Sequence, residues 1–259
     1  MLAFSSLLGN VEGQNIYRIW YDKPASYWEE ALPVGNGRIA AMVFGDPQLE
    51  QIQLNEETVS AGSPYQNYNE EAKAALPEMR RLIFEGKYEE AQNMAATKIL
   101  SQVGNEMPYQ TVGRLNIRYQ DHKKVSNYYR DLDISNAVAV TRYKVDGVEF
   151  TEETFASFTD QLVIRHIKAS KPGAINCELF FNTPMREPKR SIYGKKGLRL
   201  EGITHGSRYF PGKVHYCADL DVKHKGGKVI TANDTLLSVQ GASELTLYIS
   251  MATNFVNYK

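Results

Sequence analysis

Adjacent acidic residues are the first candidates for chemistry in this chain, because acid–base catalysis uses carboxyl groups placed around a reacting bond. The sequence contains three such pairs, Glu29–Glu30, Glu56–Glu57 and Glu152–Glu153. Neighbouring residues in a β-strand point to opposite faces of the sheet, so an adjacent pair does not form a facing dyad. Each pair is therefore predicted to hold one exposed carboxylate and one that is bonded locally.

Asp219 and Asp221 do share a face, because they alternate with apolar residues in the segment Val214–Lys223. They could stand near each other as a catalytic pair. The same alternation is typical of a strand with one buried face and one solvated face. The pattern favours the second interpretation, in which both aspartates lie on the outer face.

The histidines and cysteines give no sign of a metal or nucleophile site. No two histidines have the close spacing that metal ligation requires, and none is linked by spacing to a serine or cysteine nucleophile. Cys177 is in phase with its apolar neighbours whereas Cys217 is out of phase, which disfavours a disulfide. No metal and no cofactor is predicted. The histidines are His122, His166, His205, His215 and His224.

Two glycine-containing segments are candidates for ligand contact. Gly35-Asn36-Gly37 precedes Arg38 and a short apolar strand, and its residues tolerate positive φ, so Asn36 and Arg38 could project from a strand end. The alternative is an ordinary hairpin turn. The second segment surrounds His205 between Gly202 and Phe210; its alternative is a long hairpin loop.

Alternating apolar and polar residues predict that the chain is mainly β. Asp146-Gly147 between two alternating segments predicts a tight hairpin turn. Half-buried strands joined by tight turns indicate an antiparallel β-sandwich. The predicted strands are 115–119, 138–145, 148–151, 162–168, 175–181, 214–223 and 245–251.

Residues 69–100 break this pattern and predict a short helical insert. Asn69 is expected to cap a first helix, Pro77 to occupy the first position of a second helix, and Gly86 to end it before a third over 88–99. The insert is expected to pack across the sandwich or to reach a partner domain.

Composition excludes some classes of partner. The chain has 259 residues with 30 basic and 30 acidic side chains, a balance that does not favour nucleic acid. No apolar run reaches the roughly 20 residues that span a bilayer. Residues 1–15 are apolar and rich in small side chains, which predicts a leader or residual export signal and hence a periplasmic or secreted parent protein. The alternative is a disordered apolar leader.

Several motifs, in the same order, resemble the N-terminal domain of glycoside hydrolase family 95, whose members include α-L-fucosidases and some α-L-galactosidases. The resemblance covers nearly the whole chain. The motifs are Tyr27 to Gly45, Gln53 to Thr58, Met107 to Gly113, Tyr129 to Ile134, Tyr143 to Ser157 and Ala252 to Phe255.

This resemblance implies a galactose-mutarotase-like super-sandwich over residues 16–259, without catalytic residues of its own. In enzymes of the family, an inverting hydrolysis is carried out by a barrel of paired helices, which would follow Lys259. The resemblance implies two partners: the sandwich packs against that barrel, and the whole enzyme takes a fucosylated glycan as its substrate. The residues expected at the substrate rim or domain interface are Trp28, Asn36, Arg38, Asn55 and Glu56, to which the loop argument adds His205.

Three positions depart from the family pattern and leave the sugar specificity open. Ala40 stands where a glycine is usual, Ser60 replaces an aromatic residue, and Arg114 replaces an acidic one. Two other functions remain open as well. The sixteen tyrosines would suit a stand-alone carbohydrate-binding module, and the helical insert would suit an interaction domain.

Overall fold

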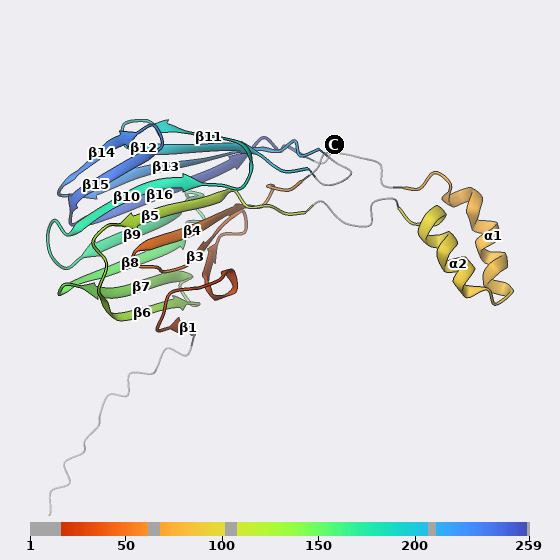
Figure 1. Cartoon of the computed structure of the whole chain (residues 1–259), viewed down its shortest axis with the longest axis horizontal. Helices are drawn as coiled ribbons and strands as arrows, with labels where there is room; N and C mark the ends of the chain where they lie inside the picture. The colour runs from red at the N-terminus through yellow and green to blue at the C-terminus, as the bar shows by residue number, and fades with distance from the viewer. Residues whose placement is uncertain (1–16, 62–67, 102–107, 207–210, 258–259) are drawn as a thin grey trace, which may run out of the picture.

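A computed structural model describes residues 17–61, 68–101, 108–206 and 211–257, and the expected leader over residues 1–15 lies outside them. The described strands form two antiparallel sheets that face each other as a sandwich (Figure 1). The fold class predicted from the sequence is therefore confirmed. The nine-stranded sheet has the order β1 (Arg18–Tyr21), β6 (Val125–Asp133), β7 (Val138–Val145), β8 (Val148–Ala156), β9 (Val163–Ala169), β16 (Glu244–Thr253), β13 (His215–Lys225), β12 (Gly197–Ile203) and β11 (Arg186–Tyr193).

The seven-stranded sheet carries the segments that matter most for the candidate site. A short 3₁₀ helix, η1 (Trp28–Glu30), precedes its first strand. The order is β14 (Lys228–Asn233), β15 (Leu236–Ala242), β10 (Ile175–Asn182), β5 (Gly113–Tyr119), β4 (Leu49–Glu56), β3 (Ile39–Val43) and β2 (Leu32–Gly35).

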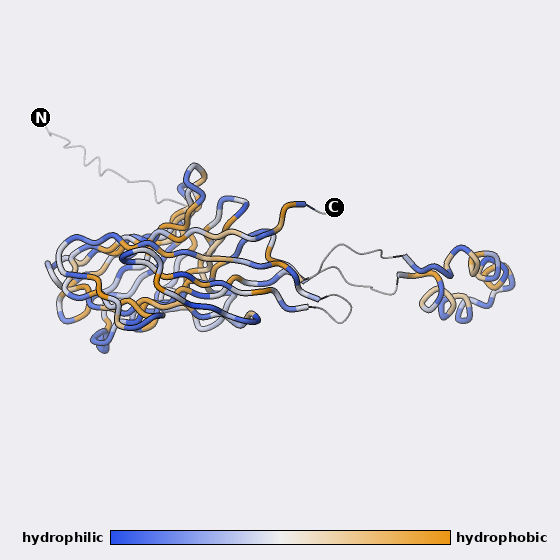
Figure 2. Tube along the Cα trace, turned by 90° about the horizontal axis from the view of Figure 1, so that it is seen from above, coloured by the Kyte–Doolittle hydropathy of each residue, from blue (hydrophilic) through white to orange (hydrophobic). Residues whose placement is uncertain are grey.

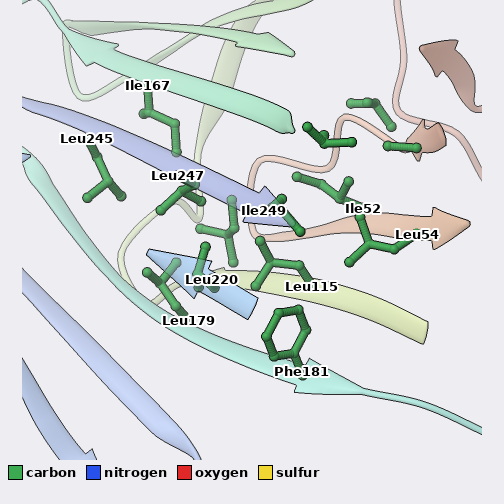
Figure 3. Packing of buried hydrophobic residues seen from close by; sticks show 14 of the residues in the cluster. Ile52, Leu54, Leu115, Ile167, Leu179, Phe181, Leu220, Leu245, Leu247 and Ile249 are labelled. Carbon is green, nitrogen blue, oxygen red and sulfur yellow. The ribbon is translucent and has the colours of Figure 1, made fainter. Parts of the chain in front are cut away.

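The space between the sheets is filled by aliphatic and aromatic side chains from both of them (Figure 3). Ile52 and Leu115 from the seven-stranded sheet meet residues such as Leu247 and Ile249 from the nine-stranded sheet, and all of these are fully buried. Each such side chain contributes about 1.5–3 kcal/mol to folding. This packing fixes which face of every strand points inward.

Two sequence predictions about strands are confirmed. Val145 pairs with Val148 across the Asp146-Gly147 turn, where both turn residues have positive φ (49° and 75°), as a type I′ hairpin requires. Strand β13 buries alternate residues, and Asp219 and Asp221 lie on its outer face. The prediction that these aspartates belong to a solvated face is confirmed.

The two cysteines lie on different sheets and are both free thiols. Cys177 is buried on β10, and burial raises the pKa of its thiol. Cys217 lies on the half-exposed outer side of β13. Their opposite orientation agrees with the phase argument from the sequence.

The helical insert forms an arm that lies away from the sandwich in two views (Figures 1 and 2). It consists of α1 (Ala72–Phe84), α2 (Tyr88–Met94) and the π-helical turn η2 (Ala95–Ile99). Packing across the sandwich, one of the two expectations for the insert, is therefore wrong. None of these described helices has the length and apolar character needed to cross a bilayer.

The prediction of a helix start at Pro77 is also wrong, because Pro77 lies inside α1. Proline within a helix removes one backbone hydrogen bond and crowds the preceding turn. A continuous helix places Ala75 and Leu82 seven positions apart on one face, and both are buried where α1 packs on α2 and η2. Gly86 does end the helix, with φ at 75°.

Candidate functional site

The turn that contains Asn36 lies at the end of the sandwich from which the arm extends, a region named here the arm end. The Asn36 side chain is buried: its Oδ1 accepts the backbone N–H groups of Arg38 and Ile39, and its Nδ2 donates to the Ser157 carbonyl at 2.8 Å. Gly37 has positive φ (95°), whereas Gly35 does not. The segment is a hairpin turn between β2 and β3 whose amide side chain fastens it to the β8–β9 loop.

Arg38 projects from this turn toward the last strand of the chain. Its Nε donates to Gln161 Oε1 at 2.8 Å, and its Nη1 donates to the Met251 carbonyl at 3.0 Å and lies 3.3 Å from Glu56 Oε1. About a third of the side chain remains exposed. Arg38 thus ties the β3–β4 ladder to β16, which belongs to the opposite sheet.

Glu56 is buried beside Arg38 and completes this arrangement. Its second carboxylate oxygen accepts the backbone N–H of Thr58 at 2.8 Å and the Thr58 hydroxyl at 2.6 Å. That hydroxyl also contacts the Thr253 hydroxyl at the end of β16. The arm end therefore contains a hydrogen-bonded network between the two sheets, next to the point where β16 finishes.

Asn55, Trp28 and His205 lie apart from this network. Asn55 is on the outer face of β4, near the Thr111 hydroxyl. His205 Nε2 lies 2.9 Å from the Pro184 carbonyl, and the His205 backbone exchanges two hydrogen bonds with the Gln110 amide. Residues 207–210 of the predicted loop lie outside the described residues.

Trp28 is half-exposed on η1. It lines the same hollow as Leu49 and Gln51 at the start of β4, whereas Glu56 of the arm end is the last residue of that strand. This hollow, of about 280 Å³, lies on the outer face of the seven-stranded sheet. A second hollow, of about 330 Å³, lies on the same face, and Arg114 lines both. The first hollow is lined by Ala25, Ser26, Tyr27, Trp28, Phe44, Asp46, Leu49, Gln51 and Arg114, and the second by Gln53, Thr111, Gly113, Arg114, Asn182, Thr183 and Pro184.

The six predicted residues therefore fall into two groups. Asn36, Arg38 and Glu56 belong to the arm-end network, whereas Trp28 lines an outer hollow. Asn55 and His205 contact residues that line the second hollow, through Thr111 and Pro184 respectively.

A third polar cluster, buried between the sheets, was not predicted from the sequence. Arg165 on β9 donates to Thr154 and Glu50 at 2.7 Å each, and also bonds Glu152. Glu152 further accepts the hydroxyls of Tyr119 and Tyr143, at 3.0 and 2.7 Å. All of these side chains are enclosed, so the cluster ties β4 to β8 and β9 and has no access for a ligand.

Burial and the charge of Glu152 raise the pKa of Glu50 to about 7, and the opposing effect of Arg165 does not cancel them. Burial likewise raises the pKa of Tyr119 and Tyr143 far above the usual range. Because the pKa of Glu50 lies near neutral pH, this buried carboxyl group changes its charge over the neutral range rather than in acid.

The sequence did contain a signal for this cluster. Arg165 is in phase with Val163 and Ile167, and Glu50 is in phase with Ile52. A charged residue in phase with a buried apolar row points inward. The adjacent glutamates otherwise behave as predicted: Glu57 and Glu29 are exposed, and Glu56 and Glu30 are bonded locally. Glu152 differs, since its partners come from other strands.

Among the described residues, no three His, Cys, Asp or Glu side chains gather as ligands for a metal ion. Of the two outer hollows, the first includes a single carboxylate, Asp46, and the second includes none. Hydrolysis by two opposed carboxyl groups therefore has no site in either hollow.

Residues 19–258 match the family described as "Glycosyl hydrolase family 65, N-terminal domain". The chain belongs to this family. Alpha-L-fucosidase 2 of Arabidopsis thaliana is 31% identical over 95% of the chain, and a protein of Aspergillus niger described as "Probable alpha-fucosidase A" is 26% identical over 92%. These matches support the resemblance to a family 95 N-terminal domain that the motifs indicated.

The chain spans about a third of the length of these relatives, 31% and 30% respectively. Among solved structures, a putative kojibiose phosphorylase from the human microbiome aligns over 94% of the chain and 33% of its own, with a TM-score of 0.47 and 10% identity. The fucosidase relatives that contain a matching N-terminal region are thus roughly three times as long as this chain.

Proposed function

We propose that this chain is the non-catalytic N-terminal domain of an inverting glycoside hydrolase that removes terminal α-L-fucosyl or α-L-galactosyl groups. The observation that carries the proposal is the match to fucosidase relatives over nearly the whole chain but only about a third of their length. The catalytic residues then belong to the remaining two thirds of such a protein.

The arm end is the surface proposed to face the catalytic domain. Strand β16 finishes there at Thr253, beside Thr58 and Arg38, so a following segment starts next to the arm-end network. Figure 1 places the arm at the same end. A domain that follows β16 would therefore lie between the network and the arm.

The arm itself offers an apolar surface to such a domain. Phe84 is 88% exposed and Tyr88 is 69% exposed. The side chains buried in these two helices are Ala75, Leu82 and Ala91. Large side chains left in solvent at the tip of an arm are typical of interaction surfaces. This supports a docking role for the insert within the full-length enzyme.

An activity assay tests the proposal directly. This chain, and a polypeptide extended beyond Lys259 in the same reading frame, are incubated with an aryl α-L-fucoside. The extended protein is expected to release the phenol with inversion at the anomeric carbon, and this chain to release none. Turnover by this chain above a blank would overturn the non-catalytic role, and an extended protein that cleaves no α-L-fucoside or α-L-galactoside would overturn the proposed substrate.

The docking role has a separate test. Phe84→Ser is expected to leave the unfolding of this chain unchanged and to lower the melting temperature of the extended protein. Lys73→Ser, another exposed position on α1, is the matched control and should change neither. Equal behaviour of the two variants in the extended protein would contradict docking through the tip.

We further propose that the parent protein is exported, on the basis of the apolar, small-residue-rich segment 1–15. Fractionation of cells that express the full-length gene tests this. Recovery of the protein in the periplasm or medium is expected, and retention in the cytoplasm would overturn it.

A further inference from the structure

The two hollows on the outer face of the seven-stranded sheet share one lining residue, Arg114. Gln53, Arg114 and Asn182 pair side by side across β4, β5 and β10. The Arg114 guanidinium leans from this row toward Gln51, to which its Nη1 donates at 2.6 Å, and lies 5.5 Å from the centre of the Phe44 ring. One exposed cation is therefore part of the lining of both hollows.

The wall that carries Trp28 is held firmly although the indole itself is half-exposed. The buried Arg130 donates to the carbonyls of Lys23 and Glu30, at 2.8 and 2.7 Å. Ala25 donates its N–H to the Phe44 carbonyl at 2.9 Å. An exposed ring on a fixed segment loses little freedom when a ligand stacks on it.

The far wall of the second hollow is equally fixed. Gly113 has φ at 143°. A Cβ atom at this position would lie 2.5 Å from the Asn182 carbonyl oxygen, which is too close for any residue other than glycine. The Thr183 hydroxyl donates to the Val112 carbonyl at 2.9 Å and accepts the Met185 N–H at 3.1 Å. Backbone contact between β5 and the end of β10 thus shapes this hollow.

The lining has the chemistry of a site for an uncharged, hydroxyl-rich ligand. Asp46 and Arg114 are the charged residues among those that line the hollows, and their charges cancel. Side-chain amides supply paired donors and acceptors, and the exposed Trp28 and Tyr27 supply flat apolar faces. Sugars combine hydroxyl groups with apolar C–H faces. The guanidinium offers five donors, of which one bonds Gln51 within the described part of the chain.

We propose that the two hollows together bind a neutral oligosaccharide, with Trp28 stacking on one sugar ring and Arg114 donating to hydroxyls on both sides. The combined volume fits the range of about 300–1,000 Å³ that is typical of ligand pockets. The choice of sugar rests on the proposed function, since the chain's relatives include α-L-fucosidases. The site lies on the sheet's outer face and needs no catalytic residue.

Tryptophan fluorescence offers a direct test, because the chain has two tryptophans. Trp20 is 61% exposed on β1, outside both hollows. The variant Trp20→Phe leaves Trp28 as the only indole and is titrated with 2′-fucosyllactose, with lactose and with L-fucose. Saturable change in emission at millimolar concentration or below is expected with 2′-fucosyllactose. An equal response to lactose would support the site without preference for fucose.

Matched variants locate the binding. Arg114→Met and Trp28→Ala are expected to raise the Kd by about tenfold or more, measured by calorimetry, since each removes a main contact. Arg118→Met is the control, because Arg118 lies on the same face of β5 and over the Phe180 ring, at 4.7 Å, but lines neither hollow. Its Kd should stay within about twofold of the original.

The proposal is overturned if none of the three sugars binds, or if Arg114→Met binds as tightly as the original chain. Its failure is distinguishable from failure of the proposed function. An extended protein that cleaves fucosides while this chain binds no sugar would overturn only the proposal of sugar binding in the two hollows. Sugar binding here without fucosidase or galactosidase activity in the extended protein would overturn the proposed enzyme alone.

Discussion

Strand β4 carries polar side chains on both of its faces, and one on each face bonds an arginine. Inward, Glu50 bonds the buried Arg165 at 2.7 Å; outward, Gln51 accepts from the exposed Arg114 at 2.6 Å. The two distances are similar, but their surroundings are not. Arg165 is enclosed by Thr154 and two carboxylates, whereas Arg114 borders two open hollows.

What distinguishes a structural arginine from a binding one is whether its hydrogen-bond donors are already used inside the protein. A buried cation must be matched by partners inside the protein, because leaving it unpaired is costly. An exposed cation has no such requirement and keeps donors for a ligand.

Arg165→Met is expected to lower the free energy of unfolding by about 3–5 kcal/mol, because it leaves two buried carboxyl groups without their cation. Arg114→Met, the same change on the outer face, should cost less than about 0.5 kcal/mol. Denaturant titration of both variants measures the difference. Equal losses would show that the two arginines have the same structural weight and would remove the contrast.

Sequence reasoning predicted the elements of both faces better than the contents of the interior. Alternation predicted β7, β13 and the Asp146-Gly147 hairpin, because strand periodicity directly reflects burial. The family resemblance, rather than alternation, named Trp28 and Arg38 together as residues of a substrate rim or domain interface, and a single sequence does not state which face of which strand a loop covers. The structure separates them along β4.

The continuous helix through Pro77 illustrates a second limit. Local preference favours a helix start at proline, whereas the observed helix continues through Pro77 and packs on α2 and η2 along its length. The buried cluster is a third case. The phase of Arg165 could have indicated that it points inward, but not which groups it meets there. Glu152 lies on the neighbouring strand β8, whereas Glu50 is 115 residues away on β4 of the opposite sheet, and only the packing of the two sheets brings it to Arg165.

The pH dependence of stability tests the inward face alone. The pKa of Glu50 is raised from an ordinary value of 4.5 to about 7 in the folded protein. The folded state therefore holds this proton more tightly than the unfolded state. The resulting stabilisation is complete below pH 4.5 and is lost as the pH rises through about 7, a change on the order of 3 kcal/mol.

Glu50→Gln provides the control, because glutamine retains an oxygen for the N–H groups of Phe44 and Gly45 but does not ionise. Any constant offset from the amide does not vary with pH. Unfolding free energies measured from pH 4.5 to about 8 should decline less steeply in the variant than in the original chain. Parallel curves would mean that Glu50 is not the group that titrates.

The arm-end network gives an intermediate effect. Glu56→Ala removes a buried carboxylate that accepts from Thr58 twice and from Arg38 once, and is expected to cost about 1–2 kcal/mol. Asn55→Ala, the neighbouring outward position, should cost less than about 0.5 kcal/mol. Thermal unfolding compares the two. A larger loss for Asn55 would mean that the outer face of β4 also carries structural weight.

Gln51→Ala should have the smallest effect on stability and is the sharpest test of the outward face. Gln51 holds the Arg114 guanidinium in one orientation through a single exposed hydrogen bond. Its loss should change the free energy of unfolding by less than about 0.5 kcal/mol, yet weaken binding of 2′-fucosyllactose by about threefold or more, because the guanidinium is no longer pre-oriented. Gln120→Ala is the control, since Gln120 also makes one exposed bond, to Glu178, and lines neither hollow. If both glutamine variants bind the sugar alike, the orientation of Arg114 has no part in recognition, and the outer arginine is as passive toward ligands as the buried one.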